Sequence, residues 1–395
     1  MRILALTNLY PNPYQPHLAT FNRLQFRALA AQHQVQVIAP IAWTGEWSAR
    51  RGGAPLSLSH DRTRISDGMI IHHPRYAFTP KVLRGLYGRF FVESVRECFE
   101  DVVREFRPDV ALGCWAFPDG WATVQLAREV NLPVAIKVHG SDVLGLADQP
   151  ARRRLTAQAL READAVIAVS RNLGENAVAL GAHPSRVHTV CNGIDASVFS
   201  PGPGDAARRE LGIQSPDPLI LFVGNLVAVK GLDVLISALE SLRREGVKFQ
   251  AALVGDGPLK GELQARIDGL ALADHVRLLG PRPQSELPVW YRSASLLVLP
   301  SRSEGIPNVM LEAAACGTPC VASRVGGIPE IASPDLLVAP GDPSELAGKI
   351  RMVLDAPGTF RGTVARQPSS WSDSARALSD VLQGISAAAT RALAG

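Results

Sequence analysis

The chain has 395 residues, of which 46% are hydrophobic and 20% are charged. These values are typical of a soluble globular protein with large cores, organised as about two domains. The net charge of +4, from 41 Lys and Arg against 37 Asp and Glu, is too small to indicate a nucleic-acid partner. No apolar run approaches the roughly 20 residues of a membrane-spanning helix.

The first residues, 1–13, contain an apolar stretch that is too short for a signal peptide and is typical of a buried strand. Five cysteines without the spacing of a disulfide framework indicate a reducing compartment, so we expect a cytoplasmic protein. Cys316 and Cys320 lie four residues apart, but no second pair and no nearby His completes a metal site. We therefore expect neither a metal nor another cofactor.

Short apolar runs alternate with helical patterns along the whole chain. Continuous apolar runs indicate strands that are buried on both faces, and strand–helix alternation predicts parallel sheets. In the first half we predict strands at 2–7, 35–40, 109–115, 133–140, 164–170 and 187–193, with a helix at 22–32. In the second half we predict strands at 219–225, 249–257, 276–280, 294–300, 318–323 and 335–340, with helices at 231–246 and 307–317.

The alternation breaks once, in a polar segment rich in Pro and Gly, where we place a linker at 200–218. The expected fold class is α/β, with two doubly wound, Rossmann-like domains. The first spans 1–199 and the second spans 219–365. The last segment, 366–395, is predicted to form a helix that packs back on the first domain.

Ligands of such sheets bind at the carboxyl ends of the strands, so the residues that follow each strand are the candidates for function. Lys230 stands between a strand that ends at Gly224 and a helix that begins near Gly231. A helix start attracts phosphate through its free amides and its dipole, and Lys230 would add a full charge. A solvated lysine at a helix start is the alternative.

Two further loops follow strands of the second domain. Gly255 and Gly257 form a turn that allows close approach of the backbone to a ligand, or that is simply a turn. Glu304 lies in the loop 301–307, and Glu312 lies inside the helix that follows. A carboxylate suits a sugar diol, because each oxygen can accept one hydroxyl hydrogen. The alternative is a pair of glutamates that cap and solvate one helix.

In the first domain, His139 ends a strand and is a candidate contact for a sugar or a carbonyl group, as is Asp119. Structural roles are the alternative for both. Asn12, Ser141 and Asp142 lie in loops of the same kind and complete the candidate acceptor side.

The segment 74–109 is basic and aromatic. In it, cationic and apolar residues interleave: Lys81, Arg84 and Arg89 with Val82, Leu83, Leu86, Tyr87, Phe90 and Phe91. Such a segment can lie on an anionic membrane surface, or it can be an ordinary helix with a solvated face.

The stretch "EGIPNVMLE" resembles the Glu-x7-Glu motif of the retaining glycosyltransferases of family 4. The agreement extends over nearly the whole chain, and order and spacing together make it specific. The matching stretches are "YPNPYQPHLATF", "PDGWA", "HGSDV", "NGID", "FVGNLVAVKG", "VGDGP", "SRSEGIPNVMLEAAACGTPCVAS" and "GGIPEI". The resemblance implies a GT-B fold with two Rossmann-like domains facing a cleft, a nucleotide-sugar in the second domain, and a terminal helix that crosses back.

By this resemblance, Glu304 contacts the donor sugar, Glu312 the nucleotide ribose, and Lys230 the diphosphate. His139 faces the donor sugar from the first domain. The remaining donor-binding residues are Gly224, Asn225, Gly255, Gly257, Gly305, Ile306, Pro307, Asn308 and Val309. Two positions depart from the family pattern, since Asn225 stands where an Arg is frequent and Ala19 where a Gly is common.

The expected reaction is metal-independent sugar transfer with retention of configuration, in which Lys230 and helix amides stabilise the departing diphosphate. A UDP-sugar is the first expected donor and GDP-mannose the second. The expected acceptor is a glycan or a lipid-linked molecule of cell-surface polysaccharide or glycolipid assembly, at the inner face of the membrane if lipid-linked. Sugar-nucleotide epimerisation or hydrolysis is the main alternative. Phosphorolysis and non-catalytic binding of a sugar-nucleotide are further alternatives.

Overall fold

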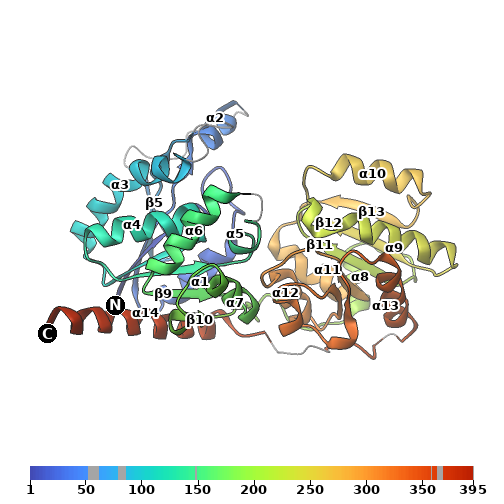
Figure 1. Cartoon of the computed structure of the whole chain (residues 1–395). Helices are drawn as coiled ribbons and strands as arrows, with labels where there is room; N and C mark the ends of the chain where they lie inside the picture. The colour runs from blue at the N-terminus through green and yellow to red at the C-terminus, as the bar shows by residue number, and fades with distance from the viewer. Residues whose placement is uncertain (52–61, 79–85, 147–148, 357, 363–367, 395) are drawn as a thin grey trace. The chain divides into compact units, whose positions relative to one another are not determined.

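The computed structural model describes residues 1–51, 62–78, 86–146, 149–356, 358–362 and 368–394. The chain divides into two units. Unit 1 is Met1–Gly193 with Trp371–Gly395, and unit 2 is Ile194–Ser370. In Figure 1 each unit is an α/β fold in which helices flank a sheet.

The sheet of unit 1 has, within the described residues, the strand order β10-β9-β8-β7-β1-β2-β5-β4. Its neighbouring strands are parallel except for β4 and β5, which form an antiparallel hairpin. The strands are β1 (Arg2–Leu6), β2 (Gln34–Ile38), β4 (Thr63–Ser66), β5 (Met69–His72), β7 (Val110–Cys114), β8 (Val134–Val138), β9 (Ala165–Ala168) and β10 (Val187–Thr189). A separate parallel pair joins β3 (Ile41–Ala42) to β6 (Arg75–Tyr76).

The helices of unit 1 cover a sheet whose central strands, β7 and β8, are buried along their whole length. They are α1 (Thr20–Ala30), α2 (Trp43–Arg51), α3 (Tyr87–Phe106), α4 (Trp121–Glu129), α5 (Ser141–Leu144), α6 (Pro150–Glu162), α7 (Arg171–Ala179) and α14 (Trp371–Ala394). Short helical turns lie at Ala116–Gly120 and Pro184–Arg186. The predicted strands of this half are confirmed as parallel strands of one sheet, and β7, β8 and β9 are buried along their whole length.

The C-terminal helix α14 packs on α1 of unit 1, which confirms the predicted return of the chain. Leu378 and Leu382 are fully buried in the core of that unit. The Ser374 hydroxyl accepts a hydrogen bond from Gln25 Nε2 at 3.1 Å and donates one to the Cys191 carbonyl at 2.6 Å. The helix is therefore held by polar contacts as well as by apolar burial.

The β4–β5 hairpin was not among the predicted strands. Its two-residue turn is Asp67–Gly68, and both residues have positive φ, at 51° and 75°. A two-residue turn with positive φ at both positions matches the twist of a hairpin and favours Asp-Gly, so the dipeptide was a usable signal. The Asp67 carboxylate also accepts hydrogen bonds from Arg23 of α1 at 2.6 and 3.2 Å, which ties the hairpin to that helix.

Unit 2 contains, in its described part, a parallel sheet of order β13-β12-β11-β14-β15-β16. Its strands are β11 (Leu219–Val223), β12 (Gln250–Val254), β13 (Val276–Gly280), β14 (Leu296–Leu299), β15 (Cys320–Ser323) and β16 (Leu337–Val338). Its helices are α8 (Gly204–Glu210), α9 (Leu232–Arg244), α10 (Lys260–Gly269), α11 (Leu287–Ser293), α12 (Asn308–Ala315) and α13 (Pro343–Asp355), with 3-10 turns at Ala228–Lys230, Gln284–Glu286, Ile328–Glu330 and Pro334–Leu336.

The residues of the predicted linker 200–218 lie within unit 2, which begins at Ile194. This segment contains α8, which packs on α11. Arg208 of α8 donates hydrogen bonds to the carbonyl oxygens of Ser293 at 3.2 Å and Asp217 at 2.6 Å. The Pro- and Gly-rich composition reflects the turns on either side of this short helix. The structural boundaries accordingly fall at 193/194 and 370/371 rather than at the predicted positions.

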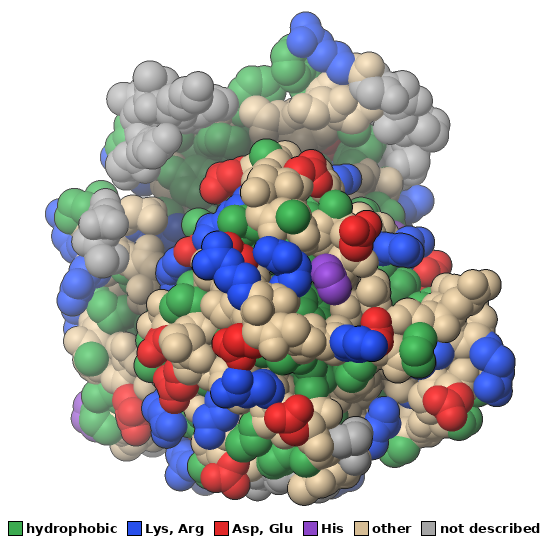
Figure 2. Space-filling model, turned by 90° about the vertical axis from the view of Figure 1, so that its right-hand side faces the viewer, with side chains coloured by type: hydrophobic (Ala, Val, Ile, Leu, Met, Phe, Trp, Pro, Cys, Tyr) green, Lys and Arg blue, Asp and Glu red, His purple; other side chains and the backbone are tan. Residues whose placement is uncertain are grey.

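The predicted membrane segment 74–109 is only partly described, since Lys81, Val82, Leu83 and Arg84 lie outside the described residues. Its described part includes α3, whose apolar face is buried in unit 1, as Phe91 and Phe99 show. Among the described helices, none combines the length and apolarity that crossing a membrane requires. On the face drawn in Figure 2, cationic and anionic side chains are interspersed, which agrees with the small net charge.

Candidate active site

The start of α9 in unit 2 is packed directly on the end of β14. Gly231, which precedes α9, has a φ of 65°, and a Cβ at this position would lie 2.0 Å from the Pro300 carbonyl oxygen. Only glycine allows this approach. The packing brings Lys230 beside the loop that begins at Ser301.

Lys230 and Glu304, which sequence analysis assigned to different parts of one ligand, are in direct contact. Lys230 Nζ donates to Glu304 Oε1 at 2.6 Å, and the Ser301 hydroxyl donates to the same oxygen at 2.7 Å. The Lys230 and Glu304 side chains remain 22% and 10% exposed. The cluster is therefore ordered and is still reachable by a ligand.

Arg302 ties together the two loops that carry this pair. Its backbone amide donates to the Val229 carbonyl at 2.8 Å, and its guanidinium donates to both Asp233 oxygens at 2.9 and 2.7 Å. A bidentate pair of this kind fixes geometry as well as adding attraction. The positions of Lys230 and Glu304 are thus set by neighbours on both loops.

A third loop supports the Glu304 backbone from the other side. Gly326 has a φ of 54°, and a Cβ there would lie 1.8 Å from the Glu304 carbonyl oxygen. The next amide, of Gly327, donates to the Gly305 carbonyl at 2.9 Å. This loop follows β15, and its glycines allow backbone to pack on backbone.

Glu312 lies inside α12 and is 6% exposed. Its Oε2 accepts a hydrogen bond from the Tyr291 hydroxyl at 2.8 Å, and its Oε1 has a long contact of 3.5 Å with Gln284 Nε2. Burial raises the pKa of the Glu312 carboxyl, while these two hydrogen bonds act in the opposite direction. One oxygen is thus firmly held, and the other is weakly engaged.

The start of α12 has the features of an anion site. In the described chain no side chain caps this helix at Pro307, and the first residues, Asn308 and Val309, are half-buried. The first amides of a helix lack partners inside the helix, and its dipole attracts negative charge. Together with the Lys230 ammonium, this end of α12 suits a phosphate group.

The glycines after β12 have a structural reason that the sequence did not reveal. A Cβ on Gly255 would lie 1.9 Å from the Gly224 carbonyl oxygen, and one on Gly257 would lie 2.5 Å from the Leu226 carbonyl oxygen. The predicted reason was close approach to a ligand, but the nearest neighbour is the chain itself. Asn225, between these contacts, is exposed.

His139 of unit 1 lies beside two aromatic rings, at 4.9 Å from Phe21 and 6.3 Å from Trp115 between ring centroids. Burial lowers the pKa of His139 well below its usual value, and Lys137 lowers it further. Its Nε2 is buried and has no partner among the described residues. Its surroundings therefore favour the neutral imidazole, and Nε2 is unpartnered in the described structure.

The carboxylates of Asp119 and Asp142 are fully buried, and their place on the candidate acceptor side stays a prediction. Asp142 accepts hydrogen bonds from the backbone amides of Ala116 at 2.9 Å, Gly140 at 2.8 Å and His139 at 3.1 Å. Asp119 Oδ1 accepts one from the Asn8 amide at 2.7 Å. Burial raises the pKa of both carboxyl groups. They fix the loops around His139.

Asn12 and Ser141 complete the predicted acceptor side. Asn12 is 8% exposed, and its Oδ1 accepts hydrogen bonds from the amides of Tyr14 and Gln15 at 3.0 and 3.1 Å, which shapes its own loop. Ser141 is exposed at the start of α5. Across the described residues no group of three His, Cys, Asp or Glu side chains is placed to hold a metal ion.

Two protein-family models match this chain, Glycosyltransferase Family 4 over residues 18–198 and Glycosyl transferases group 1 over residues 217–356. The chain belongs to this family of glycosyltransferases. The recognised Glu-x7-Glu stretch and the Lys230 loop both fall in the group 1 region, which contains the sheet of unit 2.

Two curated relatives come from Catenulispora acidiphila. D-inositol 3-phosphate glycosyltransferase 2 is 37% identical over 290 residues, which are 68% of this chain and 66% of the relative. D-inositol 3-phosphate glycosyltransferase 1 is 39% identical over 218 residues, which are 52% of this chain and 49% of the relative. The matched segments thus span about half to two thirds of these relatives.

Among solved structures, sucrose-phosphate synthase from Thermosynechococcus elongatus has a TM-score of 0.75 at 21% identity, covering 99% of this chain and 98% of the other. Anabaena HepE in complex with UDP-glucose has a TM-score of 0.68 at 19% identity, covering 100% of this chain and 99% of the other. Likeness at such identities concerns the fold, and it confirms the GT-B architecture expected for the family.

The candidate site of unit 2 thus brings together Lys230 and Glu304 and holds Glu312 on α12. Sequence analysis missed Tyr291, which precedes Glu312 by 21 residues, and no spacing or motif pointed to it. It also missed Gly326 as a support of Glu304. The double glycine at 326–327 was quoted only as part of a family pattern, although paired glycines after a strand are a sign of close backbone approach.

Proposed function

We propose that this chain is a retaining glycosyltransferase that moves a sugar from a nucleotide-sugar to a hydroxyl group of an acceptor, without a metal ion. The observation that carries the proposal is the Lys230–Glu304 contact of 2.6 Å beside the uncapped start of α12. The ammonium and the helix amides supply positive charge for a diphosphate. The Glu304 carboxylate supplies an acceptor for sugar hydroxyls.

In the reaction, negative charge develops on the diphosphate as the bond to the sugar breaks. A pre-positioned ammonium and helix amides stabilise this charge without having to rearrange, which lowers the barrier. The acceptor hydroxyl then attacks the anomeric carbon from the face that the diphosphate leaves and passes its proton to the departing diphosphate oxygen, so configuration is retained. His139, neutral and with a free Nε2, is proposed to contact the donor sugar from unit 1.

The donor is proposed to be a UDP-sugar, with GDP-mannose as the second choice. Support comes from the Anabaena neighbour, whose structure holds UDP-glucose. Glu312 is proposed to accept from the nucleotide ribose through its weakly engaged Oε1.

The acceptor is proposed to be a hydroxyl of a glycan, a lipid-linked molecule of surface polysaccharide assembly, or a phosphorylated polyol. The last class is supported by the names of the relatives, which specify D-inositol 3-phosphate. A peripheral contact of 74–109 with an anionic membrane stays a prediction.

The test is Lys230→Ala in the full chain, with Lys248→Ala as a control. Lys248 is an exposed lysine of the same unit at the opposite end of the sheet, before β12. We expect Lys230→Ala to weaken UDP-glucose binding by roughly tenfold to a hundredfold, since it removes hydrogen bonds between charged groups. Calorimetry measures binding, and release of UDP measures turnover. Unchanged binding and turnover in Lys230→Ala would overturn the proposed phosphate role.

Hydrolysis and epimerisation are distinguished from transfer by following the sugar itself. With donor but no acceptor, a hydrolase releases UDP at its full rate, and an epimerase changes the sugar without releasing UDP. We expect slow UDP release that an acceptor accelerates.

A further inference from the structure

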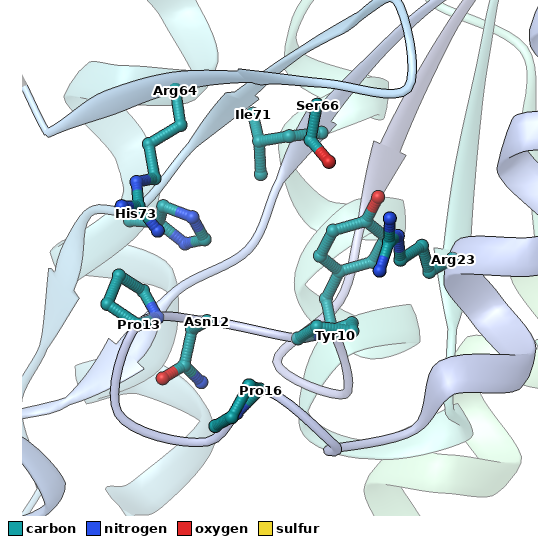
Figure 3. A pocket seen from close by; sticks show the side chains of 10 residues that line it. Tyr10, Asn12, Pro13, Pro16, Arg23, Arg64, Ser66, Ile71 and His73 are labelled. Atoms are coloured by element: carbon teal, nitrogen blue, oxygen red, sulfur yellow. The ribbon is translucent and has the colours of Figure 1, made fainter. Parts of the chain in front are cut away.

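Unit 1 contains a cavity of about 380 Å³ that the proposed donor site does not use. It lies between the loop after β1, the β4–β5 hairpin and α1 (Figure 3). The loop that forms its floor begins just after Asn8, whose amide is held by Asp119. The cavity is therefore connected by a short fixed loop to the region around His139.

Apolar groups form much of the cavity wall. The ring of Tyr10 stacks on Phe26 and is held in place by it, and Pro13, Pro16 and Ile71 add flat, rigid surfaces. Small-molecule sites typically combine such walls with a few polar groups that fix orientation. The carbon-bound hydrogens of a sugar or polyol ring suit these walls.

His73 supplies a hydrogen-bond acceptor in the cavity. It is only 2% exposed, and its Nδ1 lies 2.9 Å from the Ala39 carbonyl oxygen. A carbonyl can only accept, so Nδ1 carries the hydrogen. Burial lowers the pKa of His73, and the charges of Arg64 and Arg62 lower it further against the opposing effect of the Ala39 bond. Its Nε2 is thus a lone-pair acceptor, and it has no partner in the described structure.

Arg64 supplies positive charge on the same side of the cavity (Figure 3). It lies opposite Ile71 in the hairpin, and among the described residues it has no acidic partner. The other arginine of the lining, Arg23, is neutralised by Asp67. The lining therefore carries one uncompensated guanidinium, which can donate two parallel hydrogen bonds to an anion.

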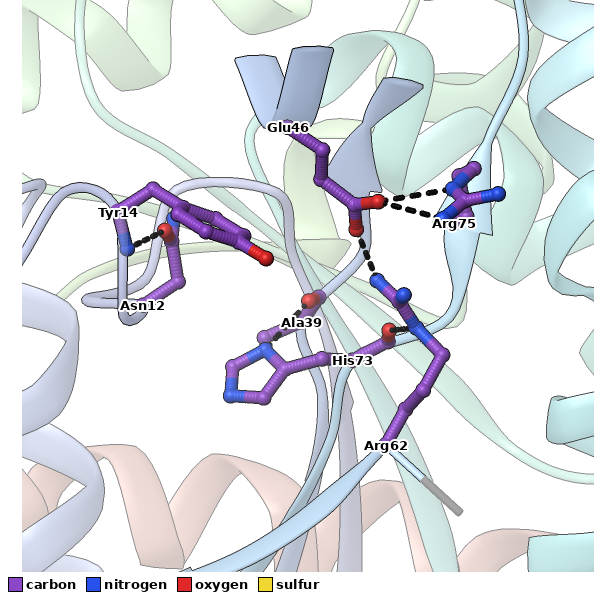
Figure 4. A network of polar contacts seen from close by, with 7 residues as sticks. All are labelled: Asn12, Tyr14, Ala39, Glu46, Arg62, His73 and Arg75. Carbon is purple, nitrogen blue, oxygen red and sulfur yellow. Dashed lines mark hydrogen bonds and ion pairs between the residues drawn. The ribbon is translucent and has the colours of Figure 1, made fainter. Parts of the chain in front are cut away.

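His73 is held from behind by an ion-pair cluster (Figure 4). The buried Glu46 carboxylate pairs with Arg62 and Arg75, and Arg62 Nε also donates to the His73 carbonyl. A carboxylate held by two guanidinium groups restrains the short connection between β5 and β6 that carries His73. His73 is thus held in place before any ligand arrives, which reduces the entropy lost on binding.

We propose that this cavity is an acceptor subsite that binds a hydroxyl-bearing ring carrying an anionic group, either phosphate or carboxylate. The anion pairs with Arg64, a ring hydroxyl donates to His73 Nε2, and the apolar ring face packs on the proline and tyrosine wall. The inference rests on the proposed function for the identity of the bound molecule as an acceptor. It assigns selection of a charged acceptor to unit 1.

The experiment is calorimetric binding to the full chain without donor. The probes are D-inositol 3-phosphate, D-glucuronate, neutral myo-inositol and inorganic phosphate. Arg64→Gln is the test variant, and Arg89→Gln, an exposed arginine of α3 without an ion pair in the described structure, is the matched control. His73→Leu is a second variant that removes the acceptor and keeps the charge.

We expect D-inositol 3-phosphate or D-glucuronate to bind more tightly than myo-inositol. Whichever of these two anionic rings binds more tightly identifies the preferred anion as phosphate or carboxylate. Arg64→Gln should weaken that binding by about tenfold and Arg89→Gln should not, since Arg64 lines the cavity and Arg89 does not. His73→Leu should weaken binding of the rings and spare inorganic phosphate. Anionic rings that bind no better than myo-inositol, or that bind Arg64→Gln unchanged, would overturn the subsite. UDP-glucose binding, measured separately, reports on the donor site, so the two proposals fail independently.

Discussion

In unit 1 the carboxylate of Asp142 accepts hydrogen bonds from three backbone amides, whereas in unit 2 the carboxylate of Glu304 accepts them from the side chains of Lys230 and Ser301. Both residues follow parallel strands at the edge where ligands of such sheets bind. Backbone amides cannot turn away, so Asp142 fixes the chain. Side chains can change partners, so Glu304 can exchange its donors for those of a ligand.

The lysines of the two units differ in the same way. Lys137 of β8 is fully buried, and its ammonium is bonded to the amide oxygens of Gln25 and of Asn192, the latter at 3.1 Å. Lys230 is 22% exposed and faces a carboxylate. The position of a charged residue after or near the end of a strand therefore does not decide between stability and binding. The nature of its partners and its burial do.

The largest expected effect is on stability, from Asp142→Ala. The change leaves the amides of Ala116, His139 and Gly140 without an acceptor in a buried place, which we expect to lower the free energy of unfolding by about 4 kcal/mol. Urea-induced unfolding of the full chain, followed by near-ultraviolet circular dichroism, measures the loss. Glu175→Ala, on the exposed face of α7, is the control and should stay within about 0.5 kcal/mol. A loss from Asp142→Ala below about 1 kcal/mol would contradict the anchoring role.

The strands and the Glu304–Glu312 loop could be predicted from the sequence, because continuous apolar runs and a strand–loop–helix order are local features. The burial of Asp119 could not, because its partner, the Asn8 amide, lies 111 positions away in the chain. On sequence alone, Asp119 and Glu304 are both carboxylates in loops after strands. Whether the Asp119 or the Glu304 carboxylate is buried depends on how loops that are distant in the sequence pack together.

Sequence analysis missed the β4–β5 hairpin and the Tyr291–Glu312 hydrogen bond for different reasons. The Asp67–Gly68 hairpin carries a local turn signal and was available to sequence analysis. The Tyr291–Glu312 hydrogen bond was not, because a tyrosine in an apolar helix is usually a core residue, and only the packing of α11 against α12 brings the hydroxyl to the carboxylate.

The second prediction concerns Lys137 and pH. Burial lowers the pKa of Lys137 from 10.5 to about 8. Between these values the unfolded chain holds a proton that the folded chain has lost, so stability must rise with pH across this interval. A pKa shift of this size changes the free energy of unfolding by roughly 3 kcal/mol once the pH has crossed the whole interval.

The measurement compares the native chain with Lys137→Met by urea unfolding at several pH values from 7 to about 10.5, the ordinary lysine pKa. Contributions of other titrating groups cancel in the difference between the two chains. We expect the stability of the native chain relative to the variant to increase with pH above about 8. A flat difference would mean that the ammonium in unit 1 is not destabilised by its burial.

The smallest expected effect tests whether a buried hydrogen bond in unit 2 serves binding rather than stability. Tyr291→Phe removes the hydroxyl that donates to Glu312 Oε2 at 2.8 Å and keeps the ring that fills the core. Glu312 then retains only the long contact with Gln284, and its pKa, already raised by burial, rises further. A carboxyl with a raised pKa loses its charge at a higher pH, so it accepts from the ribose less well as pH falls.

We expect the donor KM to increase by roughly tenfold, with kcat changed by less than about twofold, because Tyr291 touches no reacting atom. The acidic limb of the kcat/KM profile should move to higher pH. Tyr87→Phe, which removes a hydroxyl bonded to Tyr76 in unit 1, is the control and should leave both unchanged. If KM and the pH profile of Tyr291→Phe match those of the native chain, the hydroxyl is a core contact, and Glu312 belongs with Asp142 among the carboxylates that only hold the fold.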